Sequence, residues 1–202
     1  MKSLTHYIQE KLIIKKKSNN SYKYFPKTRK ELQDIILRRI EKEGNEANLN
    51  DIDVSNIKDM SNLFEDLDFN GDISNWDVSN VIDMSYMFAE CKKFNSDISN
   101  WDVSNVKSMN GMFADCDKFN KDISSWDVSN VKDMYNMFGG CLKFNQDISK
   151  WNVSNVTDMS SMFYRCKSFN QDISNWNVSN VTDKDDMFNS CTIKEKYKPK
   201  FI

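Results

Sequence analysis

The sequence predicts an α/β solenoid, in which successive coils of similar length stack on one another and share a single core. All five tryptophans recur every 25 residues, from Trp76 to Trp176, and all five cysteines keep the same spacing, from Cys91 to Cys191. Within each copy the apolar spacing changes from alternation to intervals of three and four. A unit of this length buries its apolar face only against its neighbours. Equivalent residues of successive copies are therefore considered together, as a ladder that runs along the stack.

The first 21 residues are predicted to be an amphipathic docking peptide with a polar linker. The apolar and aromatic side chains of its stripe are Leu4, Tyr7, Ile8 and Leu12. The pattern M-K-x-x-x-x-[YF]-I-x-E resembles the N-terminal capsid-targeting peptides of large tailed phages, in which a maturation protease cuts after an I-x-E triplet. The resemblance implies a processing site at Ile8, Gln9 and Glu10. A frayed N-terminal helix is the alternative.

Residues 22–46 are predicted to form a helical cap on the first coil. Thr28 and Glu31 have the spacing of a capping box, and Gly44 supplies a stop signal. The apolar stripe between these signals consists of Leu32, Ile35, Ile36 and Ile40. Such a helix suits the end of a solenoid, where the apolar face of the terminal coil needs a cover.

Residues 47–191 are predicted to form the solenoid, with about six coils. The first copy is atypical, as the end of an array requires. In it, Leu49 stands where Ile73 stands in the second copy, and Ile52 stands where Trp76 stands. This copy is also one residue shorter than the others.

The second copy shows what one coil is expected to contain. From Ile73 to Val81 apolar and polar residues alternate, which predicts a short strand. From Met84 to Cys91 the apolar intervals predict one or two helical turns, capped by Asp83 or Ser85. A short parallel strand plus a short helical turn in each 25-residue coil is leucine-rich-repeat-like, with the strands on the concave side.

The repeat string is V-S-N-V-x-D-M-x-x-M-F-x-x-C-x-x-F-N-x-D-I-S-x-W, as seen from Val78 to Trp101. It resembles the repeats of the BspA-like leucine-rich-repeat surface proteins of mycoplasmas, gut bacteria and their phages. The resemblance covers about residues 49–191. It implies a solenoid used for adhesion or protein recognition, with no catalytic residues to carry over, and it alone points to the cell surface.

Charge is divided along the chain, whose net value is −2. Residues 1–46 carry +6 and the basic C-terminal tail, residues 192–202, carries +3, so the array carries −11. An acidic array is not expected to bind nucleic acid along its length. No apolar run is long enough to span a membrane or to act as a secretory signal. A cytoplasmic or virion-associated location is therefore expected.

The cysteine and tryptophan ladders are interpreted as core. Disulfides need converging side chains and zinc needs closer ligands, and the only histidine is His6. Buried free thiols are therefore expected. The tryptophans are assigned to the core because Ile52 replaces one of them in the first copy. An aromatic platform for sugars or bases is the alternative.

The polar ladders are also interpreted as structural. Two aspartate ladders are expected to cap backbone amides, with a divalent cation such as calcium as the alternative. Their members are Asp72, Asp97, Asp122, Asp147 and Asp172, and Asp77, Asp102 and Asp127. An asparagine ladder is expected to tie neighbouring coils: Asn80, Asn105, Asn130, Asn155 and Asn180.

The function predicted from these patterns is a non-enzymatic scaffold that binds a protein or glycan, and the alternative is a phage virion component packaged through the docking peptide. No nucleophile set, phosphate loop or dinucleotide fingerprint is present, and no cofactor or metal is expected. The candidate ligand surface lies on the predicted concave face: Asn75, Asp77, Asn100, Asp102, Asp127, Lys150, Asn152 and Asn177. The pattern leaves the oligomeric state open.

Some positions vary from copy to copy while their neighbours stay constant. One such position is occupied by Tyr86, Gly111, Asn136, Ser161 and Asp186. The pairs that follow vary as well, for example Ala89 and Glu90 against Tyr164 and Arg165. These positions are expected on the convex or side surface, where the function of the coils can differ.

Overall fold

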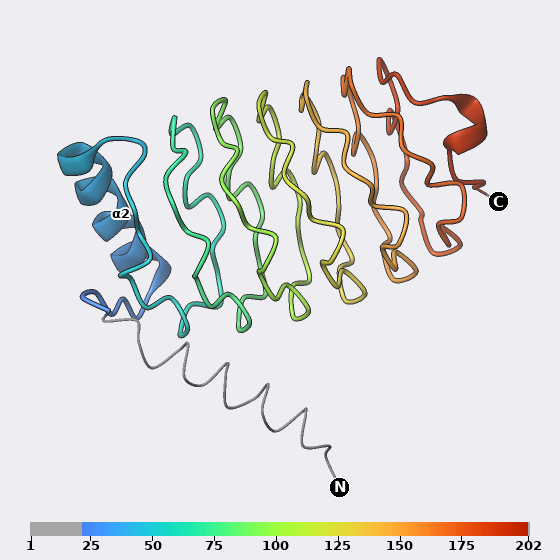
Figure 1. Ribbon diagram of the computed structural model, residues 1–202. Helices are drawn as coiled ribbons and strands as arrows, with labels where there is room; N and C mark the ends of the chain where they lie inside the picture. The colour runs from blue at the N-terminus through green and yellow to red at the C-terminus, as the bar shows by residue number, and fades with distance from the viewer. Residues whose placement is uncertain (1–21, 202) are drawn as a thin grey trace, which may run out of the picture.

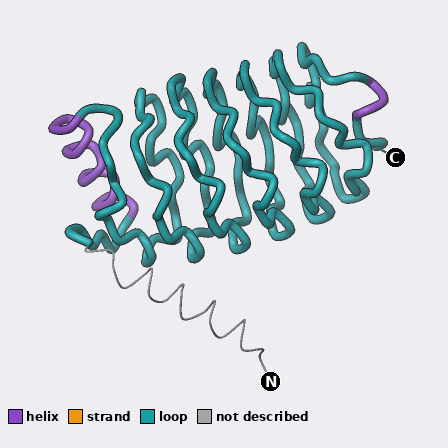
Figure 2. The backbone as a smooth tube through the Cα atoms, in the orientation of Figure 1, coloured by secondary structure: helices purple, strands orange, loops and turns teal. Residues whose placement is uncertain are grey.

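In the computed structural model the chain winds into a row of coils that lie side by side, with the helix α2 at one end and the C-terminus at the other (Figure 1). The structure describes residues 22–201. The predicted docking peptide and processing site lie outside these residues. Figure 2 shows that the backbone of the coils is almost entirely loop and turn.

The predicted N-terminal helix is present as α2, Arg29–Glu43. Its N-cap is Thr28, whose hydroxyl accepts a hydrogen bond from the amide of Glu31 at 3.2 Å. Its end is marked by Gly44, which has a φ of 83° and donates its amide to the carbonyl of Ile40. Both termini therefore follow from capping chemistry that is local in the sequence.

Helix α2 covers the first coil with its apolar stripe. Leu32 and Ile36 are fully buried, and Ile35 packs against the core beside them. The Arg29 guanidinium also donates a hydrogen bond of 2.8 Å to the carbonyl of Ser61, in the first coil. The helix thus closes this end of the row with both apolar and polar contacts.

The strand expected from Ile73 to Val81 is not formed, because the described residues of this half of the coil make two tight turns. The amide of Trp76 donates to the carbonyl of Ile73 at 3.2 Å, and that of Val81 donates to Val78 at 2.9 Å. A β-turn brings its first and fourth residues together. Buried apolar residues three apart therefore begin and end each turn.

The helical turns expected from Met84 to Cys91 are replaced by tight turns with left-handed residues. The amide of Met87 donates to Met84, and that of Cys91 donates to Phe88. Tyr86, the third residue of the first turn, has a φ of 54°. A positive φ at this position is typical of a type II turn and is incompatible with an α-helix. Apolar intervals of three fit both structures, which explains the wrong prediction.

The coils are joined by backbone hydrogen bonds through this second half of each copy. Alternate amides of one coil donate to carbonyls of the next at 2.7 to 3.0 Å; in the second coil the donors are Met84, Tyr86, Phe88 and Glu90. Isolated parallel bridges mark the register, from Asp83 to Ser108 and from Ser108 to Asp133. The half of the copy that was predicted to be helical therefore carries the inter-coil ladder.

The core is a set of stacked side chains that runs through the whole row. Phe88 lies 3.9 Å from Phe94 within its coil and 5.7 Å from Phe113 in the next, as ring-centroid distances. Trp76 and Trp101 are parallel within 3° at a centroid separation of 6.4 Å. Each coil therefore buries its apolar side chains against those of its neighbours.

The C-terminal tail covers the apolar end of the last coil. It contains the short 3-10 helix η1, Glu195–Tyr197, and the amide of Ile173 donates to the carbonyl of Tyr197 at 3.0 Å. Ile193 of the tail is only 7% exposed. The two apolar ends of the row are thus closed by different segments, α2 at one end and the tail at the other.

Candidate functional site

The eight residues of the candidate ligand surface occupy two equivalent positions in successive coils, beside the buried tryptophans. Asp77 is half-buried and the other seven are exposed. They lie in the first half of each coil, where tight turns take the place of the expected strand. Their role in ligand binding stays a prediction.

The second of these two positions has a clear structural role. Oδ1 of Asp102 accepts hydrogen bonds from the amide and the hydroxyl of Ser104, at 3.1 and 2.6 Å. Asn152 makes the same two bonds to Ser154. Such Asx turns begin each tight turn with a side-chain acceptor. An Asn serves as well as an Asp, which explains why this ladder changes from one to the other.

The first aspartate ladder, which includes Asp97 and Asp122, forms the same kind of Asx turn earlier in each coil. The amide and hydroxyl of Ser124 lower the pKa of Asp122, and those of Ser99 lower the pKa of Asp97. The ionised aspartates therefore stabilise the fold at neutral pH, and this stabilisation is lost as the pH falls through the lowered pKa values. These bonds confirm the capping role that was predicted for the ladder.

The alternative of a cation site finds no ligand cluster to support it. Within residues 22–201, no three His, Cys, Asp or Glu side chains lie close enough together to hold a metal ion. The aspartates of each ladder instead face the serine two residues ahead. The chemistry of the ladders is thus turn formation by carboxylate and amide oxygens.

The asparagine ladder ties each coil to the one before it. The side-chain amide of Asn105 donates to the carbonyl of Ser79 at 2.8 Å, and that of Asn130 donates to Ser104 at the same distance. These bonds fall on the half of the coil that lacks the backbone ladder. Side-chain amides therefore replace backbone pairing on this side of the row, and the predicted structural role is confirmed.

The cysteines are free thiols, as predicted, and four of the five are buried. The thiol of Cys116 donates to the carbonyl of Phe88 with an Sγ to O distance of 2.9 Å, and Cys141 bonds to Phe113 in the same way. Burial raises the pKa of Cys91 to about 12 and the pKa of Cys116 well above its ordinary value. Thiols of this kind are protonated at neutral pH and poorly nucleophilic.

The tryptophans are core residues, as predicted, and each has a polar partner. Trp126 is 3% exposed, and its indole N–H donates to the carbonyl of Ile98 at 3.2 Å. Trp101 bonds to Ile73 in the same way. The rings are covered by neighbouring coils, so they form no open platform on which a sugar or a base can stack.

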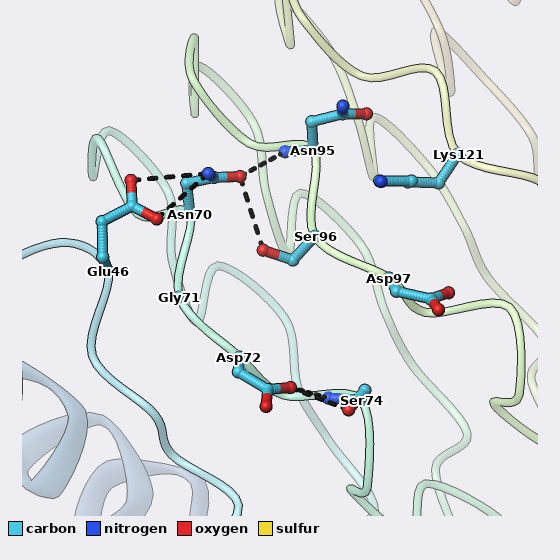
Figure 3. Close-up of a pocket in the computed structure, with 9 residues that line it drawn as sticks. All are labelled: Glu46, Asn70, Gly71, Asp72, Ser74, Asn95, Ser96, Asp97 and Lys121. Carbon is cyan, nitrogen blue, oxygen red and sulfur yellow. Dashed lines mark hydrogen bonds between the residues drawn. The ribbon is translucent and has the colours of Figure 1, made fainter.

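An open pocket of about 450 Å³ lies across the first coils, and Figure 3 shows the residues that line it. The side-chain amide of Asn70 donates to Glu46, while its Oδ1 accepts from the amide of Asn95 at 2.8 Å. The ammonium end of Lys121 points toward the centre of the pocket (Figure 3). None of the eight candidate residues lines the pocket.

The electrostatics of this pocket are mixed. Hydrogen bonds from Ser99 lower the pKa of Asp97, and the charge of Lys121 adds to the shift. Some polar groups in the pocket bond between coils, since Asn70 bonds to both Glu46 and Asn95. The pocket therefore combines carboxylates with one lysine, and the hydroxyl of Ser74 donates to Asp72 at 2.7 Å as part of an Asx turn.

Ten residues at variable positions form a second surface along the backbone ladder; four of them are exposed, four are half-buried, and Gly111 and Gly140 are buried. We call it the variable strip: Tyr86, Glu90, Gly111, Asp115, Tyr135, Asn136, Gly140, Ser161, Tyr164 and Arg165. Eight of these ten have a positive φ, between 51° and 74°. The five equivalent residues from Tyr86 to Asp186 differ in type although they share this conformation.

The strip contains three tyrosines, in different coils, with smaller residues between them. Tyr135 is 37% exposed, and the guanidinium of Arg165 lies 5.0 Å from the ring centroid of Tyr164. The ring of Tyr86 lies over Gly111, where any Cβ would collide with it. Partial burial raises the pKa of Tyr86, and the nearby Tyr135 adds to the shift. The strip thus presents tyrosine side chains separated by positions with small side chains or none.

Sequence reasoning noted the variation but did not select these residues as a site. The available signal was the contrast between them and their constant neighbours, together with the glycines at two of the positions. Gly111 and Gly140 indicate a left-handed backbone. What was missing was the knowledge that Tyr86, Asn136 and Arg165 share this conformation, which a sequence rarely reveals for residues other than glycine.

These features define a repeat protein with a continuous apolar core and one variable surface. The chain belongs to the family described as Mycoplasma protein of unknown function, DUF285, whose model matches residues 35–141 and 101–200. The two matches overlap, as copies of one repeat allow. No curated protein and no solved structure matches the chain. Within the described part of the chain, no helix has the length and apolar character to cross a membrane.

Proposed function

We propose that this protein is a non-enzymatic recognition scaffold built on a solenoid of 25-residue coils, and that its variable strip binds a protein or glycan. The observation that carries the proposal is that the strip, most of whose side chains are exposed or half-buried, varies from coil to coil while the apolar core does not. Residues that build the core and the turns repeat almost unchanged from coil to coil, whereas the strip differs in every coil. A surface that varies on a constant frame is typical of recognition.

The chemistry of the strip supports this choice of surface. Tyrosine gives a large contact area and a hydroxyl at a small cost in conformational entropy, and it is common at the centre of interfaces. Tyr86, Tyr135 and Tyr164 are spread over several coils, with Gly111 and Gly140 between them. The resemblance to adhesion repeats favours the same class of function. The surface-exposed candidate residues beside the tryptophans provide the second surface to test.

The proposal is tested by binding of the full chain to arrays of defined glycans and of synthetic peptides. The variant Y86S/Y135S/Y164S is expected to lose its binding signal by more than about tenfold, because aromatic anchors contribute most of the binding free energy of an interface. The matched variant N100A/D102N/D127N, which keeps the acceptor of each Asx turn, is expected to bind as the parent does.

Two outcomes would contradict the assignment. If the strip variant binds normally and the matched variant does not, the ligand surface is the one beside the tryptophans. If all three proteins give no signal above an unfolded control, the recognition proposal itself fails. Equal denaturant midpoints for the three proteins ensure that lost binding does not reflect unfolding.

A further inference from the structure

One side-chain position lies beside the asparagine bonds that run between coils, and its occupant changes along the row. From Asn70 onward the asparagines keep one bond throughout, since Oδ1 of Asn95 accepts from the amide of Asn120 as Oδ1 of Asn120 accepts from Asn145. The residue that follows each asparagine defines what we call the covering position. In chain order it is occupied by Glu46, Gly71, Ser96, Lys121, Gln146 and Gln171.

In two later coils the covering side chain is a glutamine that bonds to the asparagine of the coil before it. Nε2 of Gln146 donates to the backbone carbonyl and to Oδ1 of Asn120, both at 2.9 Å. Gln171 donates to the same two oxygens of Asn145, at 2.8 and 3.0 Å. A primary amide carries two N–H donors on one nitrogen, so it satisfies both oxygens at once. The chain thus shows twice which group fits over this pair of oxygens.

At the pocket of Figure 3 the same oxygens are not covered in this way. Gly71 has no side chain, and a Cβ there would collide with the carbonyl of Ala47. The hydroxyl of Ser96 is 3.4 Å from Oδ1 of Asn70, which is longer than a usual O–H···O bond. Among the described residues, no donor bonds to the backbone carbonyl of Asn70 or Asn95. The pocket is therefore the part of the row where the covering amide is missing.

The carboxylates around the pocket are already hydrogen-bonded. Glu46 accepts from the side-chain amide of Asn70 at 3.2 Å. Asp72 and Asp97 each accept from the hydroxyl of the serine two residues ahead, at 2.7 Å. Because these bonds belong to the frame of the pocket, the carboxylates do not by themselves select a cation.

Two lysines balance part of this negative charge. The ammonium of Lys121 points toward the centre of the pocket (Figure 3), and its charge acts on Asp97. The hydrogen bond to Asp68 raises the pKa of Lys93, and the charge of Glu46 adds to the shift. The pocket therefore suits a neutral group that has donors for the asparagine oxygens and an acceptor for Lys121.

We propose that this pocket binds a primary carboxamide, as carried by a glutamine side chain of a partner protein or by free glutamine. The amide nitrogen donates to the carbonyl and Oδ1 of Asn70, as Gln146 does to Asn120, and the amide oxygen accepts from the ammonium of Lys121. The pocket shares no residue with the variable strip, so this proposal and the proposed function can fail separately.

The test is a titration of the full, isotope-labelled chain followed by nuclear magnetic resonance. The probes are L-glutamine and the peptides (Gln-Ser)4, (Glu-Ser)4 and (Lys-Ser)4 with free carboxyl ends. Both glutamine probes are expected to shift the side-chain amide resonances of Asn70 and the backbone amide of Asn95. The glutamate and lysine peptides, which have no primary amide, are expected to leave them unchanged. Tighter binding of the glutamine peptide identifies a protein segment as the source of the amide, and tighter binding of L-glutamine identifies the free amino acid.

The variant S96Q supplies the covering glutamine from within the chain. It is expected to weaken binding of both glutamine probes by about tenfold or more, because its own amide takes the two oxygens of Asn70. Its denaturant midpoint should equal or exceed that of the parent. The matched control is S125Q, at an exposed position where Asn100 and Lys150 show that a longer side chain is accepted. It should bind as the parent does.

A second variant, K121M, keeps the length of the side chain and removes the donor to the amide oxygen. It should bind the glutamine probes about tenfold more weakly, and it tests the site even if S96Q does not fold. Unchanged binding in folded S96Q or in K121M would overturn the proposal. So would equal shifts at Asn70 with the glutamate or lysine peptide, or no shift there with either glutamine probe.

Discussion

The stability of the fold is expected to fall steeply above about pH 9, because four buried thiols must lose protons when the chain unfolds. Burial raises the pKa of Cys91 to about 12 and holds those of Cys116, Cys141 and Cys166 well above their usual range. In an unfolded chain a thiol has a pKa of about 8.5. Between these values the unfolded state binds fewer protons, so stability is fully present below about pH 8.5 and is lost as the pH rises.

Each buried thiol is expected to contribute about 1.4 kcal/mol per pH unit to this loss. Denaturant unfolding at pH 7, 8, 9 and 10 gives the slope directly. The variant C141A should have a slope smaller by about 1.4 kcal/mol per pH unit, whatever its stability at pH 7. Cys191 is only partly buried, so C191A should change the slope less. A slope that does not respond to C141A would show that other groups control alkaline unfolding.

Replacing Trp126 by alanine is expected to lower the free energy of unfolding by about 3–5 kcal/mol. The ring is 3% exposed and lies 6.3 Å from Phe113 by centroids, and its N–H satisfies the carbonyl of Ile98. Truncation therefore leaves a cavity and a buried carbonyl that loses its partner. Chemical denaturation followed by circular dichroism measures the change.

The comparison variant is Y135A, which removes a ring of similar size that is 37% exposed. It should cost about 1 kcal/mol or less, since little of its contact area is buried in the core. Near-parental stability of W126A would show that the tryptophan ladder does not hold the coils together. The residue type matters less than the burial, as Ile52 occupies the equivalent position in the first coil at 1% exposure.

The repeat register, the core and the N-terminal helix could be predicted because each depends on a pattern in the sequence. Identical spacing of Trp76, Trp101 and their successors required identical environments. The capping box and the apolar stripe were sufficient for α2. The prediction of which side chains are buried was correct for the same reason, since burial follows apolar periodicity in turns as well as in helices and strands.

The backbone of each coil could not be predicted from the same patterns. Residues such as Met84 and Met87 are three apart in a helix and in a tight turn alike. The choice between them depends on where the alternate amides bond, and they bond to carbonyls about 24 residues ahead, as from Tyr86 to Asn110. The pocket could not be predicted either, because Glu46 and Lys121 are distant in the sequence.

The central claim is that alternate amides in the second half of each coil bond to the next coil. The most direct test is amide hydrogen exchange in the free chain at one equivalent position. Tyr86, Gly111, Asn136 and Ser161 donate to the following coil, whereas Asp186 has no described acceptor. The first four amides should exchange at least about 100-fold more slowly than that of Asp186. Equal rates at all five positions, as helical turns within each coil would give, would contradict the account.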